Sequence, residues 1–250
     1  MLTVTLNRPE AKNAFSGEML IAAYDAWKEL DEDPDLRVGV LTGAGGSFCA
    51  GMDLKALAGG MDSLAQERFN QDPDLHWKAL LRHFRPRKPL VAAVEGYCVA
   101  GGTEILQATE IRVAGESAEF GVAEVRRGLF PLGGSTVRLH RQIGFTDAAD
   151  LLLTGRLISA DDARRIGLIG HVVPDGQALE RAHELAAMVA ANGPVAVQAV
   201  LASMRAAQNL TEEEGLAREL ELGWPVFATE DAKEGPRAFA EKREAHFTGR

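Results

Sequence analysis

The stretch Val38 to Leu54, VGVLTGAGGSFCAGMDL, and the stretch Leu90 to Leu106, LVAAVEGYCVAGGTEIL, follow one and the same pattern. Each begins with a short apolar run, which predicts a buried strand, and continues through a glycine turn and a cysteine into the start of a helix. Small residues at such a turn let the backbone approach a ligand, and free N–H groups at a helix start favour negative charge. Two such turns on adjacent strands could direct two backbone N–H groups at one oxygen, which is how an oxyanion hole is built.

Two glutamates belong to the same part of the sequence. Glu104 lies in the first turn of the helix expected after the second glycine turn, among glycines and apolar residues, and Glu124 follows further along the chain. Burial would raise the pKa of such a carboxyl group, and two carboxylates that face one cavity suit acid and base roles on a single water molecule. Purely structural roles fit the same spacing, with Glu104 complementing the helix dipole and Glu124 pairing with Arg126 or Arg127.

The composition is that of a soluble α/β chain. Of its 250 residues 46% are hydrophobic and 25% are charged, which is enough for one full-sized core or a core with an appendage. The net charge of −9 disfavours non-specific binding to nucleic acid or to an anionic membrane. The chain has no apolar run of about 18 residues and no basic segment followed by an apolar one at its N-terminus, so we expect neither a membrane span nor a secretory signal.

The cysteines and histidines argue against a disulfide framework and against a metal site. Cys49 and Cys98 both lie in the glycine turns, which fits a reducing, cytoplasmic environment. Neither has a histidine beside it, so we expect small core residues rather than nucleophiles. The six histidines are scattered without CxxC or HxxH spacing, and no metal ligand is predicted. The GAGG of the first turn lacks both a following GKS or GKT and the GxGxxG spacing, which excludes a P-loop and a dinucleotide site.

Hydrophobic periodicity predicts strands mixed with helices up to about residue 190 and helices alone thereafter. The order is strand–strand–helix rather than strict alternation. Expected strands cover residues 2–6, 36–42, 90–95, 111–115, 118–120 and 172–173, and expected helix caps are Ser16, Thr146, Ser159 and Thr211. Residues 58–80 are predicted to form a mobile loop with helical pieces, in which Met61, Phe69 and Trp77 either contact a ligand or pack normally.

Several segments in this order resemble the crotonase (enoyl-CoA hydratase/isomerase) superfamily, over essentially the whole chain. They are TLNRPEAKNAFS at 5–16, LTGAGGSFCAGMDLK at 41–55, AVEGYCVAGGTEIL at 93–106, AEFGVAEVRRGLFPLGGS at 118–135, LLLTGRLISADDARRIGLIGHVV at 151–173 and EGPRAFAEKR at 234–243. The resemblance implies an α/β fold with a spiral core of repeated strand–strand–helix turns over residues 1–190. It also implies a helical trimerisation region over residues 191–250, and a homotrimer or dimer of trimers.

The resemblance further implies an enoyl-CoA hydratase, a lyase that adds water to a trans-2-enoyl-CoA thioester in fatty-acid β-oxidation. Coenzyme A would be part of the substrate, with no other cofactor, nucleic acid or membrane involved. By position in the motifs, the N–H groups of Met52 and Gly101 would hold the thioester oxygen, and Glu104 and Glu124 would be the catalytic pair. Substrate contacts are implied for Ala50, Asp53, Leu54, Lys55, Leu132, Phe239 and Lys242, the last two closing the coenzyme site of the same or a neighbouring subunit.

Two departures from the family pattern and two alternative functions accompany this prediction. Leu132 stands where the family's hydratases commonly have glycine, which would reshape the acyl pocket or the water site. The chain starts at the strand 2–6, where relatives usually have a preceding strand, so a sheet edge would be exposed.

The alternatives are a Δ3–Δ2 enoyl-CoA isomerase and a non-catalytic acyl-CoA- or RNA-binding protein of the same fold. The glutamate pair disfavours the first alternative, and the intact glycine turns and acidic charge disfavour the second.

Overall fold

A parallel sheet of five strands forms the centre of the computed structural model, which describes residues 1–53 and 63–250. The strand order is β1-β2-β3-β5-β8. Its members are β1 (Leu2–Leu6), β2 (Gly39–Gly43), β3 (Leu90–Val94), β5 (Ile111–Gly115) and β8 (His171–Val173). A second sheet contains β4 (Tyr97–Val99), β6 (Glu119–Gly121) and β7 (Ile158–Ser159). In it β4 and β6 run parallel, and β7 is antiparallel to β6.

Successive turns of the chain place one strand in each sheet. β3 leads into β4, and β5 leads into β6, so the chain passes from the large sheet to the small one at two neighbouring positions. The segment after β2 also reaches the small sheet, but through one residue only: Cys49 forms a single parallel bridge with Cys98 of β4. Helix α5 (Gly101–Leu106) follows β4. The strand–strand–helix order predicted from the sequence is therefore confirmed.

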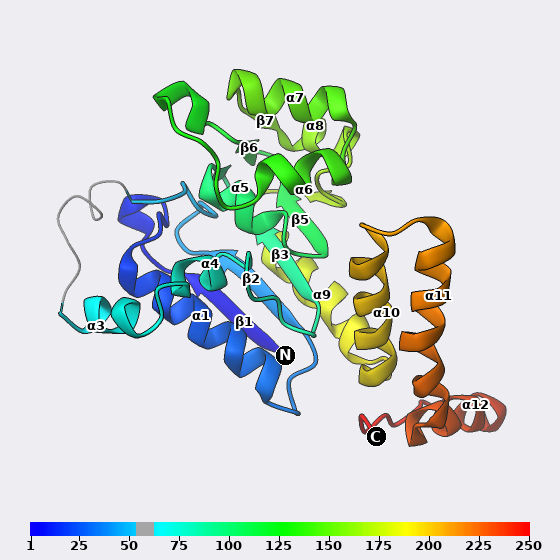
Figure 1. Ribbon diagram of the computed structural model, residues 1–250. Coiled ribbons are helices and arrows are strands. Elements are labelled where there is room, and N and C mark those ends of the chain that lie inside the picture. Colours follow the sequence, from blue (N-terminus) through cyan, green and yellow to red (C-terminus); the bar gives the residue numbers. More distant parts are fainter. Residues whose placement is uncertain (54–62) are drawn as a thin grey trace.

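Helices surround the two sheets and continue into a tail (Figure 1). Around the sheets lie η1 (Pro9–Ala11), α1 (Gly17–Glu32), α3 (Ser63–Gln71), α4 (Leu75–Ala79), α5, η2 (Glu124–Arg127), α6 (Ser135–Gln142), α7 (Phe145–Thr154), α8 (Ala160–Arg165) and α9 (Ala178–Ala190). The tail consists of α10 (Pro194–Ala207), α11 (Glu212–Gly223), η3 (Trp224–Ala228) and α12 (Glu230–Glu241). Figure 1 shows the tail helices standing apart from the sheets, beyond α9.

Helices α1 and α9 supply much of the apolar contact to the large sheet. Trp27 of α1 is fully buried, and its indole N–H donates to the carbonyl of Ala79 in α4 at 2.9 Å. On α9 the buried positions are Ala178, Ala182 and Ala186, which repeat every four residues and so form one stripe. Because alanine is small, this stripe allows α9 to pack directly on the valines of β2, β3 and β5.

Three of the four predicted helix caps are present. Ser16, Ser159 and Thr211 each accept a hydrogen bond from the backbone N–H three residues later, and Thr211 also forms a reciprocal capping box with Glu214. Such caps satisfy N–H groups that have no partner inside the helix. The local sequence was therefore sufficient to locate these three helix starts.

The cap predicted at Thr146 and the start of the second strand are wrong by a few residues. The carbonyl of Gly144 accepts the first helical bond, from Ala148 at 2.9 Å, so Thr146 lies inside α7. The strand predicted over residues 36–42 begins only at Gly39, because the N–H of Leu36 is used in a turn that bonds the carbonyl of Asp33.

The segment predicted as a loop with helical pieces contains α3 and α4 in its described part. Phe69 and Trp77 are half-buried and pack against the main core, which favours the packing interpretation for both. Met61 lies outside the described residues. Among the described helices, no single one is long and apolar enough to span a membrane, and α9 and α10 pass that test only as a pair bent by 107°.

The alanine stripe of α9 generates a stability prediction. Ala182→Leu adds three carbons where α9 meets the sheet, and overpacking of this kind should lower the free energy of unfolding by about 1–3 kcal/mol. Ala187→Leu, on the exposed side of the same helix, should change it by less than about 0.5 kcal/mol. Urea denaturation of both variants measures the difference, and equal stabilities would contradict the packing described above.

Candidate active site

The two glycine turns, residues 43–53 and 95–102, lie directly against each other. The N–H of Cys49 donates to the carbonyl of Tyr97 at 2.9 Å, and the N–H of Val99 donates to the carbonyl of Cys49 at 3.0 Å. Both cysteine side chains are buried as free thiols, and burial raises the pKa of Cys49 to about 12. A thiol held in its protonated form is a poor nucleophile, so the cysteines serve as small core residues.

The N–H groups of Met52 and Gly101 come together where the turns meet. Gly51 has φ +97°, and a side chain there would place its Cβ only 2.8 Å from the Cβ of Ala100, so only glycine fits. A Cβ built at Gly101 would stand 3.7 Å from the nitrogen of Met52, which shows how near the two amides are. Neither N–H donates a hydrogen bond within residues 1–53 and 63–250, so both are left for a ligand.

The first glycine turn is fixed by two side chains that sequence analysis did not single out. Asn13 is fully buried, and its amide donates to the carbonyls of Ala44 and Ser47 at 2.8 and 2.6 Å. Arg8 forms an ion pair with Asp53 at 2.9 Å. The sequence signal for these contacts was that Arg8 and Asn13 are polar residues in the turn after the first strand. Such side chains can form hydrogen bonds to nearby backbone groups or pair with an opposite charge.

The first turn also contains the proposed substrate contacts of the N-terminal half. Ala50 is half-buried, and its N–H donates to the carbonyl of Lys12 at 2.9 Å. The carboxylate of Asp53 is engaged by Arg8, which gives it a role in holding the turn. Leu54 and Lys55 lie outside the described residues.

Glu104 is 5% exposed in the first turn of α5. Its Oε1 accepts a hydrogen bond from the N–H of Ser135 at 3.3 Å. Gly133 lies so close that a Cβ built there would be 2.4 Å from Oε2, so a larger residue would collide with the carboxylate. Burial raises the pKa of Glu104, while the backbone N–H groups of Ser135 and Gly133 and the charge of Arg138 oppose this rise.

Glu124 begins η2 and is half-buried. Its Oε2 is buried without a hydrogen-bond partner among the described residues. Burial and, second, the negative charge of Glu104 raise the pKa of Glu124 to about 7, with Arg127 acting in the opposite direction. The structural alternative, an ion pair with Arg126 or Arg127, is wrong for the described part of the chain. A carboxyl group that titrates near neutral pH is suited to proton transfer.

The remaining predicted residues lie in two different places. Leu132 is 53% exposed in the loop between η2 and α6, beside the Gly133 that touches Glu104. Phe239 is 87% exposed on α12, and Lys242 caps the C-terminal end of that helix. Figure 1 shows α12 at the far end of the tail from α5, so one subunit does not bring these two residues to the glutamates.

The contacts around Glu104 include residues that sequence analysis missed. Gly133, Ser135 and Arg138 all belong to the segment after Leu132, and a pair of glycines before a helix start was the signal for close backbone approach. No group of three or more His, Cys, Asp or Glu side chains in the described ranges is arranged to hold a metal ion. The candidate site thus contains two carboxyl groups that interact electrostatically, and Glu104 lies one helical turn from the N–H of Gly101.

The raised pKa of Glu124 predicts a pH-dependent stability difference. A folded-state pKa of about 7, above the ordinary 4.5, favours the folded state only while the group is protonated. The wild type should therefore lose stability relative to Glu124→Gln as the pH rises from about 4.5 to about 7. Thermal melts at pH 4.5 and pH 8 measure this, with the exposed Glu116→Gln as control. A melting-temperature difference that is the same at both pH values would contradict the burial of Glu124.

Comparisons with known proteins identify the family of the chain. The profile of the enoyl-CoA hydratase/isomerase family matches residues 1–250. The chain is 55% identical to a Mycobacterium tuberculosis protein named enoyl-CoA hydratase EchA19, over 100% of this chain and 93% of that protein. It is 38% identical to the 2,3-dehydroadipyl-CoA hydratase of Escherichia coli, over 100% and 96% of the two chains.

Solved structures give the same result for the fold. The crystal structure of enoyl-CoA hydratase EchA1 from Mycobacterium marinum matches with a TM-score of 0.88 at 42% identity, covering 99% of this chain and 94% of that one. The enoyl-CoA hydratase of Bacillus anthracis matches with a TM-score of 0.91 at 35% identity, covering 99% and 95%. The chain therefore belongs to the enoyl-CoA hydratase/isomerase family, that is, to the crotonase superfamily.

Proposed function

We propose that this chain is an enoyl-CoA hydratase of fatty-acid metabolism, which adds water across the C2=C3 bond of a trans-2-enoyl-CoA thioester. The observation that carries the proposal is the meeting of two unpaired N–H groups, from Met52 and Gly101, beside the buried carboxyl group of Glu104. Relatives named as hydratases support it. The free thiols Cys49 and Cys98 support a reducing, cytoplasmic location.

The two N–H groups would act on the thioester oxygen. Negative charge builds on this oxygen as water adds at C3, and preorganised donors stabilise the charge without having to reorient. Removing one donor of such a pair typically reduces the rate by about 10²–10³. The backbone conformations of Gly51 and Ala100, with φ +97° and +52°, aim the donors before substrate arrives.

The two glutamates would divide the proton transfers. Glu104 orients the water and takes one of its protons as the new O–C3 bond forms, while Ser135 and Gly133 hold its carboxylate in place. Glu124, with a pKa of about 7, gives its proton to C2. Because the two groups interact electrostatically, they titrate as a pair, and a pH profile reports the pair rather than either residue alone.

This mechanism predicts that Glu104→Gln and Glu124→Gln each reduce hydration by at least about 10², while binding of the CoA ester is largely kept. The loss of enoyl absorbance of crotonyl-CoA measures the rate. Glu119→Gln, in β6, is the control and should stay near wild type.

Near-wild-type turnover in either glutamine variant would exclude the two-glutamate mechanism. A protein that converts a 3-enoyl-CoA to the 2-enoyl-CoA but does not hydrate crotonyl-CoA would be an isomerase. A protein that binds CoA esters without turnover would be the non-catalytic alternative.

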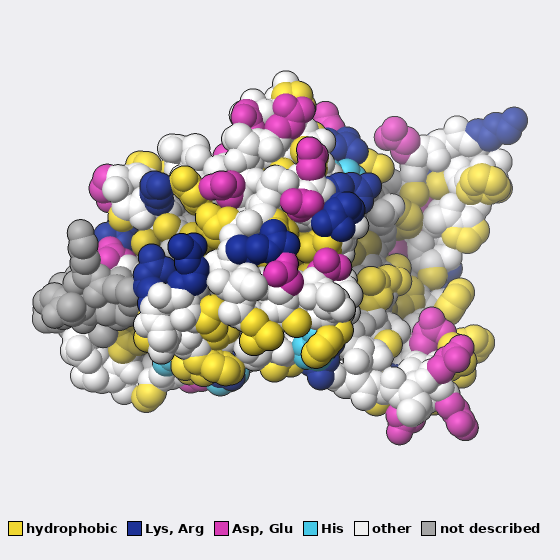
Figure 2. Space-filling view, turned by 90° about the horizontal axis from the view of Figure 1, so that it is seen from above, with side chains coloured by type: hydrophobic (Ala, Val, Ile, Leu, Met, Phe, Trp, Pro, Cys, Tyr) yellow, Lys and Arg dark blue, Asp and Glu magenta, His cyan; other side chains and the backbone are white. Residues whose placement is uncertain are grey.

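We also propose that the chain assembles as a trimer or a dimer of trimers. Large exposed apolar side chains gather on α9 and the tail and again over residues 124–153, which we call the catalytic segment because it begins at Glu124. Surfaces of this kind mark interfaces. Those on α9 and the tail are Met188, Val200, Met204, Leu210, Leu216, Leu220, Trp224, Phe227 and Phe239. Those around the catalytic segment are Val125, Leu129, Phe130, Leu132, Val137, Phe145 and Leu153. Figure 2 shows the tail projecting beside the core with hydrophobic side chains on its surface.

When two different surfaces of one chain complement each other, copies of the chain associate head to tail. They close into a ring when the rotation from one copy to the next allows it. In such a ring the tail of one copy would reach the catalytic segment of the next. Phe239 and Lys242 would then help to close the coenzyme site of a neighbouring subunit, which accounts for a phenylalanine that is 87% exposed in one chain.

This arrangement predicts a trimeric or hexameric mass by light scattering at micromolar concentration, and a monomer would contradict it. Phe239→Ala combined with Lys242→Ala should raise KM for crotonyl-CoA about tenfold with kcat retained, because a buried aromatic contact is lost. Lys233→Ala, exposed on the same helix, is the control. An unchanged KM in the double variant would refute the role of these two residues.

A further inference from the structure

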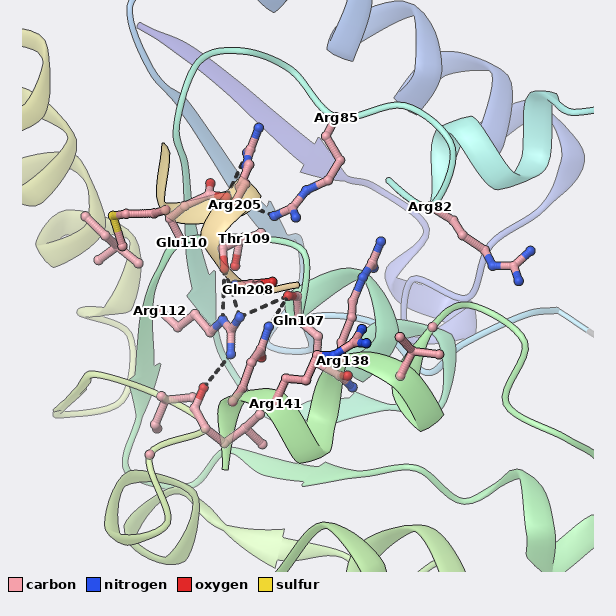
Figure 3. A pocket seen from close by; sticks show the side chains of 18 of the residues that line it. Arg82, Arg85, Gln107, Thr109, Glu110, Arg112, Arg138, Arg141, Arg205 and Gln208 are labelled. Carbon is pink, nitrogen blue, oxygen red and sulfur yellow. Dashed lines mark hydrogen bonds and ion pairs between the residues drawn. The ribbon is translucent and has the colours of Figure 1, made fainter. Parts of the chain in front are cut away.

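A cavity of about 960 Å³ lies beyond the C-terminal end of α5 (Figure 3). Its walls come from residues 82–85, from the segment 107–112, from the loop 130–134 and α6, from α8 with the loop after it, and from α10. None of the four proposed catalytic and oxyanion residues, Met52, Gly101, Glu104 and Glu124, lines it. The cavity is therefore not formed by the glycine turns, although Leu132, a predicted substrate contact, and Arg138, whose charge acts on Glu104, lie in its walls.

Positive charge dominates the walls of this cavity, which we call the arginine cavity. Its lining includes Arg82, Arg85, Arg112, Arg138, Arg141, Arg164 and Arg205. Among the described lining residues Glu110 is the one carboxylate, and it is already shared by Arg85 at 3.0 Å and Arg205 at 2.7 Å. The other five arginines form no ion pair within the described part of the chain. This excess of positive charge occurs in a chain whose net charge is −9.

Two of these arginines, the buried Arg112 and the half-buried Arg138, form no ion pair in the described part of the chain, although the charges of Glu110 and Glu104 act on them from further away. Among the described residues, the guanidinium of Arg112, a residue 9% exposed, donates only to the carbonyl oxygens of Gln107, Thr109 and Leu168. Burial lowers the pKa of Arg112 to about 10. Burial and, second, repulsion from Arg85 lower the pKa of Arg138 to about 10. A bound anion would offset this destabilisation.

Unsatisfied donors lie in the same walls. The Nη1 of Arg138 and the Nε atoms of Arg85 and Arg205 are buried and have no acceptor among the described residues. Buried polar atoms without a partner are uncommon in folded proteins, and they indicate that a water, an ion or a ligand completes the site. Figure 3 shows Arg85 and Arg205 converging on Glu110, with Arg112 and Arg138 on neighbouring walls.

We propose that the arginine cavity, which neither glutamate lines, binds a small ligand that carries phosphate groups. The planar guanidinium group matches phosphate oxygens in pairs of parallel hydrogen bonds. Five guanidinium groups without an ion pair in the described part of the chain, of which Arg112 and Arg138 are withdrawn from solvent, favour a ligand with more than one negative charge, and a phosphate ester supplies close to two. The volume lies within the range of small-molecule sites. Neither glutamate lines the cavity, so pyrophosphate binding does not depend on hydration. Phe130, Leu132, Val137 and Met204 lie in its walls and are also among the exposed side chains assigned above to contacts between copies.

Calorimetry with inorganic pyrophosphate as the probe tests the proposal on the full chain. We expect one binding event per chain, and an affinity that falls as salt is raised from about 0.01 M to about 0.15 M. Combining Arg141→Gln with Arg164→Gln removes two exposed guanidinium groups from different walls and should weaken binding at least about tenfold. Arg165→Gln is the matched control, because Arg165 neighbours Arg164 on α8 but pairs with Asp162 outside the cavity.

Four results would overturn the proposal. The first is no binding to the wild type, and the second is equal binding to the wild type and the double variant. The third is displacement of pyrophosphate by crotonyl-CoA together with a raised KM in the double variant, which would mean that the cavity holds the phosphates of the substrate. The fourth is loss of the wild-type oligomer in the double variant, which would mean that an acidic segment of a second copy occupies the cavity. Failure of hydration activity would leave the calorimetric result unchanged.

Discussion

The backbone contact between the two glycine turns is the constraint on which the rest of the site depends. Gly51 lies against Ala100 and Gly101 so closely that any side chain at position 51 would collide. The contact is possible because β2 and β3 are parallel neighbours in the large sheet and the segments that follow them are joined by the bridge between Cys49 and Cys98. Rigid strands beneath two tight turns fix the donors before a ligand binds, which is the condition for electrostatic stabilisation of a transition state.

The same close packing gives the two glutamates different properties. Glu104 is the more deeply buried, yet backbone N–H groups and Arg138 oppose the rise of its pKa. Glu124 has an unpaired oxygen, and its pKa rises to about 7. Two carboxyl groups of one kind thus lie in different surroundings, which is how two such groups can take different roles in proton transfer. The hydrogen bonds to Glu104 come from the segment after Leu132, and therefore from tertiary contacts rather than from its own helix start.

Charge is distributed unevenly over the molecule. The chain is acidic overall, but α6, α8 and α10 bring arginines from distant parts of the sequence to one cavity that holds a single carboxylate among its described lining. The tail in turn exposes apolar side chains such as Trp224 and Phe227, which are 72% and 73% exposed. Both features leave charged or apolar groups without a partner in the described part of an isolated chain, and the two proposals above, a phosphate-bearing ligand and an assembly of copies, rest on them.

The sequence by itself determined the features that depend on neighbours along the chain. These are the strand–strand–helix order, the two glycine turns, three helix caps and the position of Glu104 at a helix start, because turn residues, caps and hydrophobic periodicity act over a few residues. Only the tertiary structure decided what lies beside Glu124, that Gly133 and Ser135 contact Glu104, and that arginines of three helices share a cavity. Those contacts are between segments tens of residues apart along the chain. A single sequence carries no signal of which distant side chains will be buried together in a region of low dielectric constant. The burial that results, rather than residue type, sets their charge and pKa.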